Sequence, residues 1–239
     1  CGVCVLGTIG YVVRGSVALY YAKYYLGGDS GMQSLFLSTG VGAAILAMIA
    51  STWITKRYCK VKLFRFSQMA VGLLSVIMYF AVGPQDVVLA FVLFFLISFV
   101  VDLHAPIFWS AIAEVVDYGE SKEGKRVAGL AFGGISFCQK AGMGVAGALV
   151  GWLLAYFEYT PGTEQSEFTL TGIVLMLTVI SGFFHYLVGW LMNRYVITDD
   201  EYAKLAKVVA DNRAATAKAE STASDTVPST SNMTRGVQS

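Results

Sequence analysis

The stretch Ala113-Glu-Val-Val-Asp-Tyr-Gly-Glu-Ser-Lys-Glu-Gly-Lys-Arg126 is the longest dense run of charge between two strongly apolar regions of the chain. Val87–Ile112 precedes it, and the glycine-rich Val127–Phe157 follows it. Each apolar region is long enough to cross a bilayer, because a spanning helix needs about 20 mainly apolar residues. Each also carries ionisable side chains near its middle. The pattern predicts a charged hinge between two spanning helices.

The composition of the whole chain also indicates a membrane protein. Of the 239 residues, 56% are hydrophobic and 14% are charged, against about 45–50% and about 25% in soluble domains. A net charge of +1 gives no reason to expect nucleic-acid binding. The four cysteines show neither a disulfide framework nor metal-site spacing, so we expect free thiols. Because the chain begins at Cys1 rather than Met, we expect it to be part of a longer reading frame.

Hydropathy predicts an all-α, polytopic membrane protein whose residues 1–197 form a six-helix bundle. The capping box Thr198-Asp-Asp-Glu201 predicts a short helix at 198–213, and the Ala/Ser/Thr-rich remainder, 214–239, is predicted to be disordered. The six predicted spans are residues 2–26, 32–54, 64–82, 87–115, 127–157 and 168–195.

The distribution of Lys and Arg predicts the orientation of these spans. Basic residues concentrate in the loop Thr55–Arg65, in the hinge and after the sixth span, which lie on one side if all six segments cross. Since cytoplasmic loops carry excess Lys and Arg, this side is predicted to be cytoplasmic. The short helix and both chain ends are then cytoplasmic too.

Three intramembrane positions are candidates for ligand contact. Arg14 lies mid-way along the first span and shares a helix face with Tyr11 and Tyr21, a combination that suits sugar hydroxyls or a carboxylate. The alternative is a structural ion pair inside the bundle. Asp102 and Trp109 share a face of the fourth span, which Pro106 should kink.

A kinked helix carrying Asp and Trp would make a ligand wall, since Trp stacks on the apolar face of a pyranose. Asp102 could equally be a structural counter-ion for Arg14 or Lys140. We expect His104 and His185 to serve packing, because one neighbouring backbone group can satisfy an imidazole.

Lys140 is the strongest single candidate. It lies near the middle of the fifth span, with Gln139 beside it and Ser136 one turn earlier. Glycines follow roughly the same face, and small residues let helices approach closely. We therefore predict a tightly packed interior helix that directs Lys140 at the bundle axis.

The charged hinge suggests a gate. Glu114, Asp117 and Glu120 would lie within reach of the basic Thr55–Arg65 loop, and Arg126 closes the run. Ion pairs at the mouth of a helix could form a two-state gate that holds one side shut. The alternative is a solvated loop of mixed charge. No enzyme motif and no cluster with metal-ligand spacing appears in the sequence, so we predict neither catalysis nor a metal site.

Several of these motifs together resemble a known family. Ala113–Glu120, Ser136–Lys140, Gly147–Trp152 and Arg14-Gly-Ser16 resemble the C-terminal half of the glycoside–pentoside–hexuronide:cation symporters. These belong to the major facilitator superfamily and have twelve helices in two six-helix halves. The resemblance implies that this chain forms helices 7–12 and that an N-terminal six-helix half is missing.

The resemblance also implies roles for particular residues. Lys140 matches a lysine of helix eleven near the sugar and cation sites, and Asp117, Glu120 and Arg126 match a cytoplasmic gating loop. It implies sugar or glycoside symport with Na⁺ or H⁺ by alternating access in the lipid of a bacterial inner membrane, without a covalent cofactor. Alternatives are an organic-anion transporter and a non-transporting receptor or assembly subunit.

Overall fold

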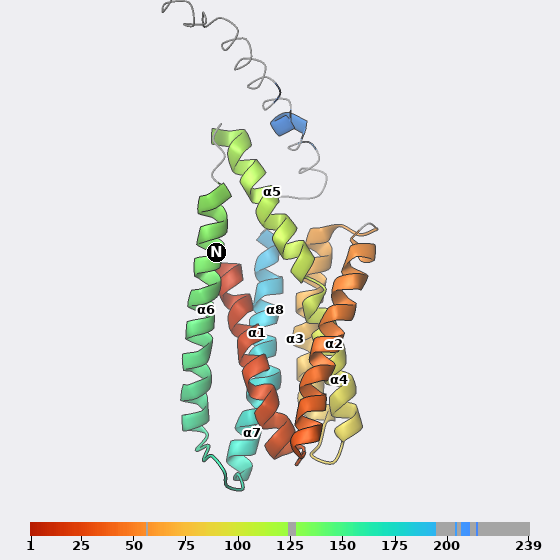
Figure 1. Cartoon of the computed structure of the whole chain (residues 1–239), viewed down its shortest axis with the longest axis vertical. Helices are drawn as coiled ribbons and strands as arrows, with labels where there is room; N and C mark the ends of the chain where they lie inside the picture. The colour runs from red at the N-terminus through yellow and green to blue at the C-terminus, as the bar shows by residue number, and fades with distance from the viewer. Residues whose placement is uncertain (56, 124–127, 195–203, 205–206, 211–213, 215–239) are drawn as a thin grey trace, which may run out of the picture.

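The computed structural model describes residues 1–55, 57–123, 128–194, 204, 207–210 and 214, with only the backbone described at 121–123. These residues form a bundle of long helices without a strand in any described segment (Figure 1). Six helical stretches are long and apolar enough to cross a membrane, which confirms the all-α, six-span fold class. The predicted helix at 198–213 and tail at 214–239 lie almost entirely outside the described residues.

The first and last spans are interrupted by short π-helical segments, and the fourth is divided into two helices. The elements are α1 (Gly2–Tyr20), η1 (Tyr21–Tyr25), α2 (Ser30–Ile54), α3 (Lys60–Ala81), α4 (Val87–Asp102), α5 (Ala105–Glu123), α6 (Ala128–Tyr156), α7 (Glu167–Leu175), η2 (Met176–Ile180), α8 (Ser181–Leu191) and η3 (Met192–Arg194).

Two of the spans begin at side-chain caps. The Asp29 carboxylate accepts a hydrogen bond from the Met32 N–H at 2.8 Å, and the Ser166 hydroxyl accepts one from the Thr169 N–H at 3.2 Å. Such caps satisfy backbone donors that have no partner within the helix.

The charged run that was predicted to be a hinge is helical over its described part, Ala113 to Glu123. α5 continues through Ala113 to Glu123, so the predicted end of the fourth span at residue 115 is too early. The break lies about ten residues earlier, at Leu103 and His104, where Pro106 cannot donate the helical hydrogen bond. Pro106 leaves the Asp102 carbonyl without its helical donor, and within the break the Ser51 hydroxyl of α2 donates to the Leu103 carbonyl at 2.9 Å. The predicted kink is therefore present, and a neighbouring helix stabilises it.

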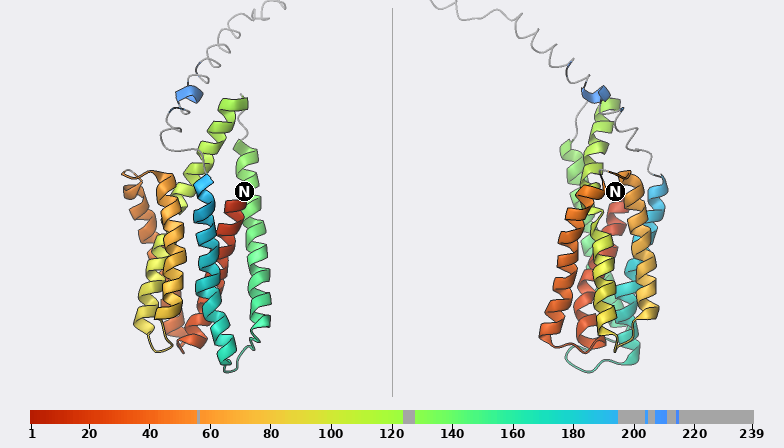
Figure 2. Two further views of the ribbon diagram at one scale, coloured as in Figure 1. Left: turned by 180° about the vertical axis from the view of Figure 1, so that it is seen from behind. Right: turned by 90° about the vertical axis from the view of Figure 1, so that its right-hand side faces the viewer.

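The best-packed helix pair is α3 and α8, which lie side by side in Figure 2. Glycines allow this approach: a Cβ atom built on Gly72 would lie 2.8 Å from Tyr186 Cβ and 3.0 Å from the Gly182 carbonyl oxygen. Contacts this short leave no room for a methyl group. The α3–α8 pair is consequently a rigid part of the bundle.

The fifth span is not the interior helix that was predicted. α6 lies at the edge of the bundle (Figures 1 and 2) and packs mainly on α1. Its only buried residues among those described are Gly142, Ala146 and Val150. Four glycines expected at close helix contacts face open space instead: Gly133, Gly144, Gly147 and Gly151. Glycine spacing identified a face that permits close packing, but no helix among the described residues covers it.

Candidate functional site

A cavity of about 270 Å³, mainly apolar but with several polar side chains in its wall, lies where α1, α3, α6 and α8 meet the break between α4 and α5. Its wall carries four of the residues singled out from the sequence: Tyr11, Asp102, Trp109 and Gln139. Asp102 ends α4, whereas Trp109 lies in the first turns of α5, so the break brings both side chains to one cavity. This arrangement agrees with the predicted ligand wall on a kinked helix.

Arg14 lies beside this cavity but not in its wall. It is buried, and its Nη2 donates to the Phe94 carbonyl at 3.1 Å and to the Ser98 hydroxyl at 3.0 Å. Its guanidinium also lies 4.8 Å from the centre of the Phe94 ring. These contacts fix α1 to α4, as the structural alternative for Arg14 expects, although the partners are a carbonyl and a hydroxyl rather than Asp102.

Tyr21 also lies away from the cavity. Its side chain is 1% exposed and stacks on Tyr25 at 5.0 Å between ring centres, with Phe36 at 5.8 Å. The helical face that suggested a ligand contact for Tyr21 instead packs into the aromatic core between η1 and α2.

Lys140 and Ser136 are exposed on α6 and do not line either cavity described here. The prediction that Lys140 points at the axis of this bundle is therefore wrong. Its neighbour Gln139 does reach the cavity, because successive residues of a helix point about 100° apart. Lys140 consequently belongs to the outer face of α6.

Two cavity residues were not predicted as ligand contacts. Gln68 of α3 and His185 of α8 are each 1% exposed, and His185 Nδ1 lies 2.7 Å from Gln68 Oε1. The sequence did contain a signal, since both are polar side chains inside apolar spans. His185 was interpreted as packing, and Gln68 was passed over because an uncharged amide is less conspicuous than a charge.

A second cavity of about 340 Å³ lies at the α5 end of the bundle and shares Val3, Cys4, Phe64 and Phe108 with the first. Its walls are mainly apolar, but they include the charged side chains of Lys60 and Glu114. The shared side chains form a layer between the two cavities. A continuous route through the bundle would require this layer to move.

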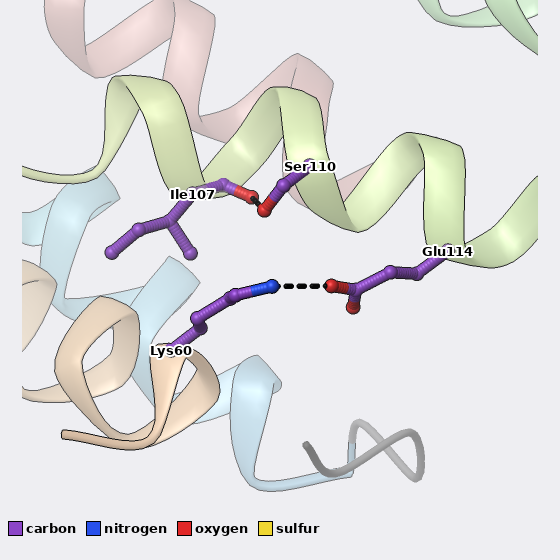
Figure 3. Close-up of polar contacts among 4 residues, drawn as sticks. All are labelled: Lys60, Ile107, Ser110 and Glu114. Carbon is purple, nitrogen blue, oxygen red and sulfur yellow. Dashed lines mark hydrogen bonds and ion pairs between the residues drawn. The ribbon is translucent and has the colours of Figure 1, made fainter. Parts of the chain in front are cut away.

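An ion pair connects α3 to α5 at this second cavity. Lys60 Nζ lies 2.9 Å from Glu114 Oε1, and the Glu114 side chain is only 6% exposed (Figure 3). One turn earlier on α5, the Ser110 hydroxyl donates to the Ile107 carbonyl at 2.9 Å. Glu114 thus reaches the basic loop region as expected, although it does so from within a helix.

The structure gives less detail on the other predicted gate residues. Asp117 and Glu120 lie further along α5, and each has interactions with its surroundings. Arg126 falls outside the described residues.

Exchanging the two charges of the ion pair tests whether it matters for function. Lys60→Glu alone should lower the activity of the whole protein about tenfold, because it places two carboxylates together beside a buried position. Glu114→Lys alone should have a similar effect, and the double exchange should restore at least half of the activity. Initial rates measure this. A double variant as impaired as the singles would show that the pair itself is dispensable.

Comparison with known proteins identifies one family and several relatives of this chain. The sequence pattern of the family described as MFS/sugar transport protein matches residues 1–199. The "Putative glycoside/cation symporter YagG" of Escherichia coli K12 is 30% identical over 92% of this chain and 47% of its own length. The inner membrane symporter YicJ of the same organism is 32% identical over 77% of the chain and 40% of its own length.

A more distant relative, the "Putative sulfoquinovose importer" of Escherichia coli K12, is 26% identical over 67% of the chain and 34% of its own length. The chain thus spans about half the length, or less, of these curated relatives. All three names describe transporters, and none describes an enzyme. Together with the six spans and the cavity that holds several polar side chains, the match over residues 1–199 shows that the chain belongs to the MFS/sugar transport protein family.

Proposed function

We propose that this chain is one six-helix half, helices 7–12, of a symporter that couples Na⁺ or H⁺ to the uptake of a sugar or glycoside. The observation that carries the proposal is the cavity at the α4–α5 break, whose mainly apolar wall holds a few polar side chains. Asp102 and Gln139 supply hydrogen-bonding groups there, and Trp109 supplies an aromatic face. This combination suits a polyhydroxylated ring, which has polar edges and apolar faces.

The outer face of α6 supports the second part of the proposal, a missing six-helix half. Lys140 and Ser136 lie on this face, together with glycines that have open space around them. An ammonium group facing lipid near mid-span costs at least about 2.5–3.5 kcal/mol on insertion scales. A second bundle against α6 would remove this cost and place Lys140 between the halves, beside the substrate path.

Alternating access then assigns a role to the α5 end of the bundle. The basic residues favour a cytoplasmic location for this end and for the C-terminus, and the name of YicJ supports an inner membrane. The Lys60–Glu114 pair would hold α5 against α3 while the gate is closed. Movement of α5 about the break at Leu103 and His104 would open it.

A second candidate is transport of an organic anion, which the name of the sulfoquinovose importer favours, since sulfoquinovose combines a sugar ring with a sulfonate. Lys140 would then bind the anion. The cavity favours the neutral sugar, because none of its lining residues in the described part of the chain is Lys or Arg.

Asp102→Asn in the whole transporter tests the proposal. A carboxylate that accepts hydrogen bonds from sugar hydroxyls should, when replaced by an amide, lower accumulation of the transported glycoside by about 10- to 100-fold. The measurement is uptake of radiolabelled methyl glycosides by proteoliposomes under an imposed Na⁺ or H⁺ gradient. It also identifies the coupling ion.

Asp29→Asn is the matched control for this experiment. Asp29 is exposed at the start of α2, and Asn caps a helix as well as Asp does. If the Asp102→Asn variant takes up glycoside at the wild-type level, Asp102 has a structural role. Accumulation of anions alone by the wild type would establish the second candidate.

A further inference from the structure

Two buried side chains in the cavity wall have unused hydrogen-bonding capacity. Gln68 and His185 bond to each other at 2.7 Å, across the interface between α3 and α8. Each keeps one nitrogen atom, Gln68 Nε2 and His185 Nε2, without a partner among the described residues. A buried polar group without a partner costs roughly 1–3 kcal/mol. Two of them beside one cavity point to a ligand that completes their bonding.

The surrounding helices hold this pair in place. A Cβ atom built on Gly182 would lie 2.7 Å from Ser75 Cβ, and one built on Gly189 would lie 2.7 Å from Met69 Cγ. These close approaches lie on either side of the pair along α3 and α8. The backbones therefore cannot separate without losing tight packing, and the pair is preorganised.

The chemistry of the pair does not depend on which amide orientation is assigned. If Gln68 Oε1 faces the ring, His185 Nδ1 carries the proton, which leaves an amide N–H donor and an imidazole acceptor unused. If the amide is reversed, an amide oxygen acceptor and an imidazole N–H donor are left instead. The ring is taken as neutral, since a buried unpaired charge is very costly. In both cases the pair offers one donor and one acceptor.

A donor beside an acceptor is complementary to hydroxyl groups, each of which both donates and accepts. It is a poor match for a carboxylate or sulfonate, whose oxygens only accept. Asp102, also in the wall, would repel an anion. The volume of about 270 Å³ lies just below the usual range of roughly 300–1,000 Å³ for ligand pockets, which favours a single sugar ring.

We propose that Gln68 and His185 form a hydroxyl-recognition pair that selects a neutral pyranose over an anionic substrate. This inference rests on the proposed function and adds the substrate class and two specificity-determining residues. Both free nitrogens are covered in this conformation. Ligand binding therefore requires side chains of the cavity wall to move, and the wall includes His104 and Phe108 at the break between α4 and α5.

The test compares binding of methyl hexosides and pentosides, of both anomers, with binding of their monodeoxy analogues. Wild-type whole transporter should lose about 3- to 10-fold in affinity when one particular hydroxyl is removed. Gln68→Met retains side-chain length but removes both polar atoms. The Gln68→Met variant should bind the parent glycoside about as weakly as the wild type binds the deoxy analogue. Its affinities for the parent glycoside and for the deoxy analogue should differ by less than twofold.

His185→Asn gives an independent measurement, because its amide can still bond to Gln68 while the free ring nitrogen is lost. It should show the same loss of discrimination. Ser75→Ala is the matched control: Ser75 is buried on α3 with an unpartnered hydroxyl but does not line the cavity. Size-exclusion profiles and thermal unfolding confirm that each variant folds.

The possible results separate the inference from the proposed function. Unchanged hydroxyl discrimination in folded Gln68→Met or His185→Asn, with the wild type binding glycosides, overturns the hydroxyl-recognition pair alone. The same loss in Ser75→Ala also overturns it, since the effect would then be a general one of the α3–α8 interface. If the wild type binds no neutral glycoside but binds a sugar acid, both the inference and the proposed sugar symport fail.

Discussion

Lys140→Ala in the whole transporter should lower cation-driven glycoside accumulation by at least about 30-fold while leaving membrane insertion intact. The reason is its place on the outer face of α6, where an ammonium group inside a spanning helix needs a polar partner outside this half. Removing one member of a charged pair at an interface typically costs at least 2 kcal/mol, or about 30-fold. Uptake by proteoliposomes with equal amounts of each variant measures the effect.

Lys62→Ala is the matched control for this experiment, because Lys62 is also an exposed lysine but lies in the first turn of α3, at a bundle end. It should transport within about twofold of wild type. If Lys140→Ala also transports normally, then Lys140 neither contacts the substrate path nor binds the other half. The resemblance that assigns it a role near the sugar and cation sites would then not extend to this chain.

Gly72→Ala should cause a clear loss of stability through a single added methyl group at the α3–α8 contact. The new Cβ would lie 2.8 Å from Tyr186 Cβ and 3.0 Å from the Gly182 carbonyl oxygen. Neither atom is at the free end of a flexible side chain, so the α3 and α8 backbones would have to separate. We expect a cost of about 1–3 kcal/mol, as is typical of overpacked cores. Thermal unfolding in detergent, followed by tryptophan fluorescence, measures it.

Gly144→Ala is the corresponding control on a helix with a free face. Nothing lies within 4 Å of the added methyl group, and alanine favours helix over glycine by about 0.8–1 kcal/mol. This variant should be as stable as wild type or slightly more stable when the chain is studied alone. A large loss of stability at Gly144 would mean that another part of the protein already covers this face of α6.

The sequence was sufficient for the features that depend on one helix at a time. Twenty-residue apolar stretches predicted six spans, and Pro106 predicted the interruption that places Asp102 and Trp109 at one cavity. Features that depend on which helices are neighbours were less predictable. Tyr21 shares a helix face with Arg14, yet its neighbours are Tyr25 and Phe36 in the aromatic core.

The errors about the fifth span and the hinge have two different physical origins. A glycine spacing shows that a close approach is possible, but not whether a partner is present, and Lys140 was consequently assigned to the wrong side of α6. The charged run around Glu114 seemed too polar for a spanning helix. It extends α5 beyond the apolar region, where charge and helical structure are compatible.

The single contact face of α6 has a consequence for assembly. Within the described bundle, α6 is held mainly by α1, through the small residues Gly142, Ala146 and Val150. The α3–α8 pair, by contrast, packs closely along its length. We expect the half to form as a five-span nucleus to which α6 is added last. Because α6 depends mainly on α1 for its packing, changes along this one contact should affect the placement of α6 more than that of any other described span.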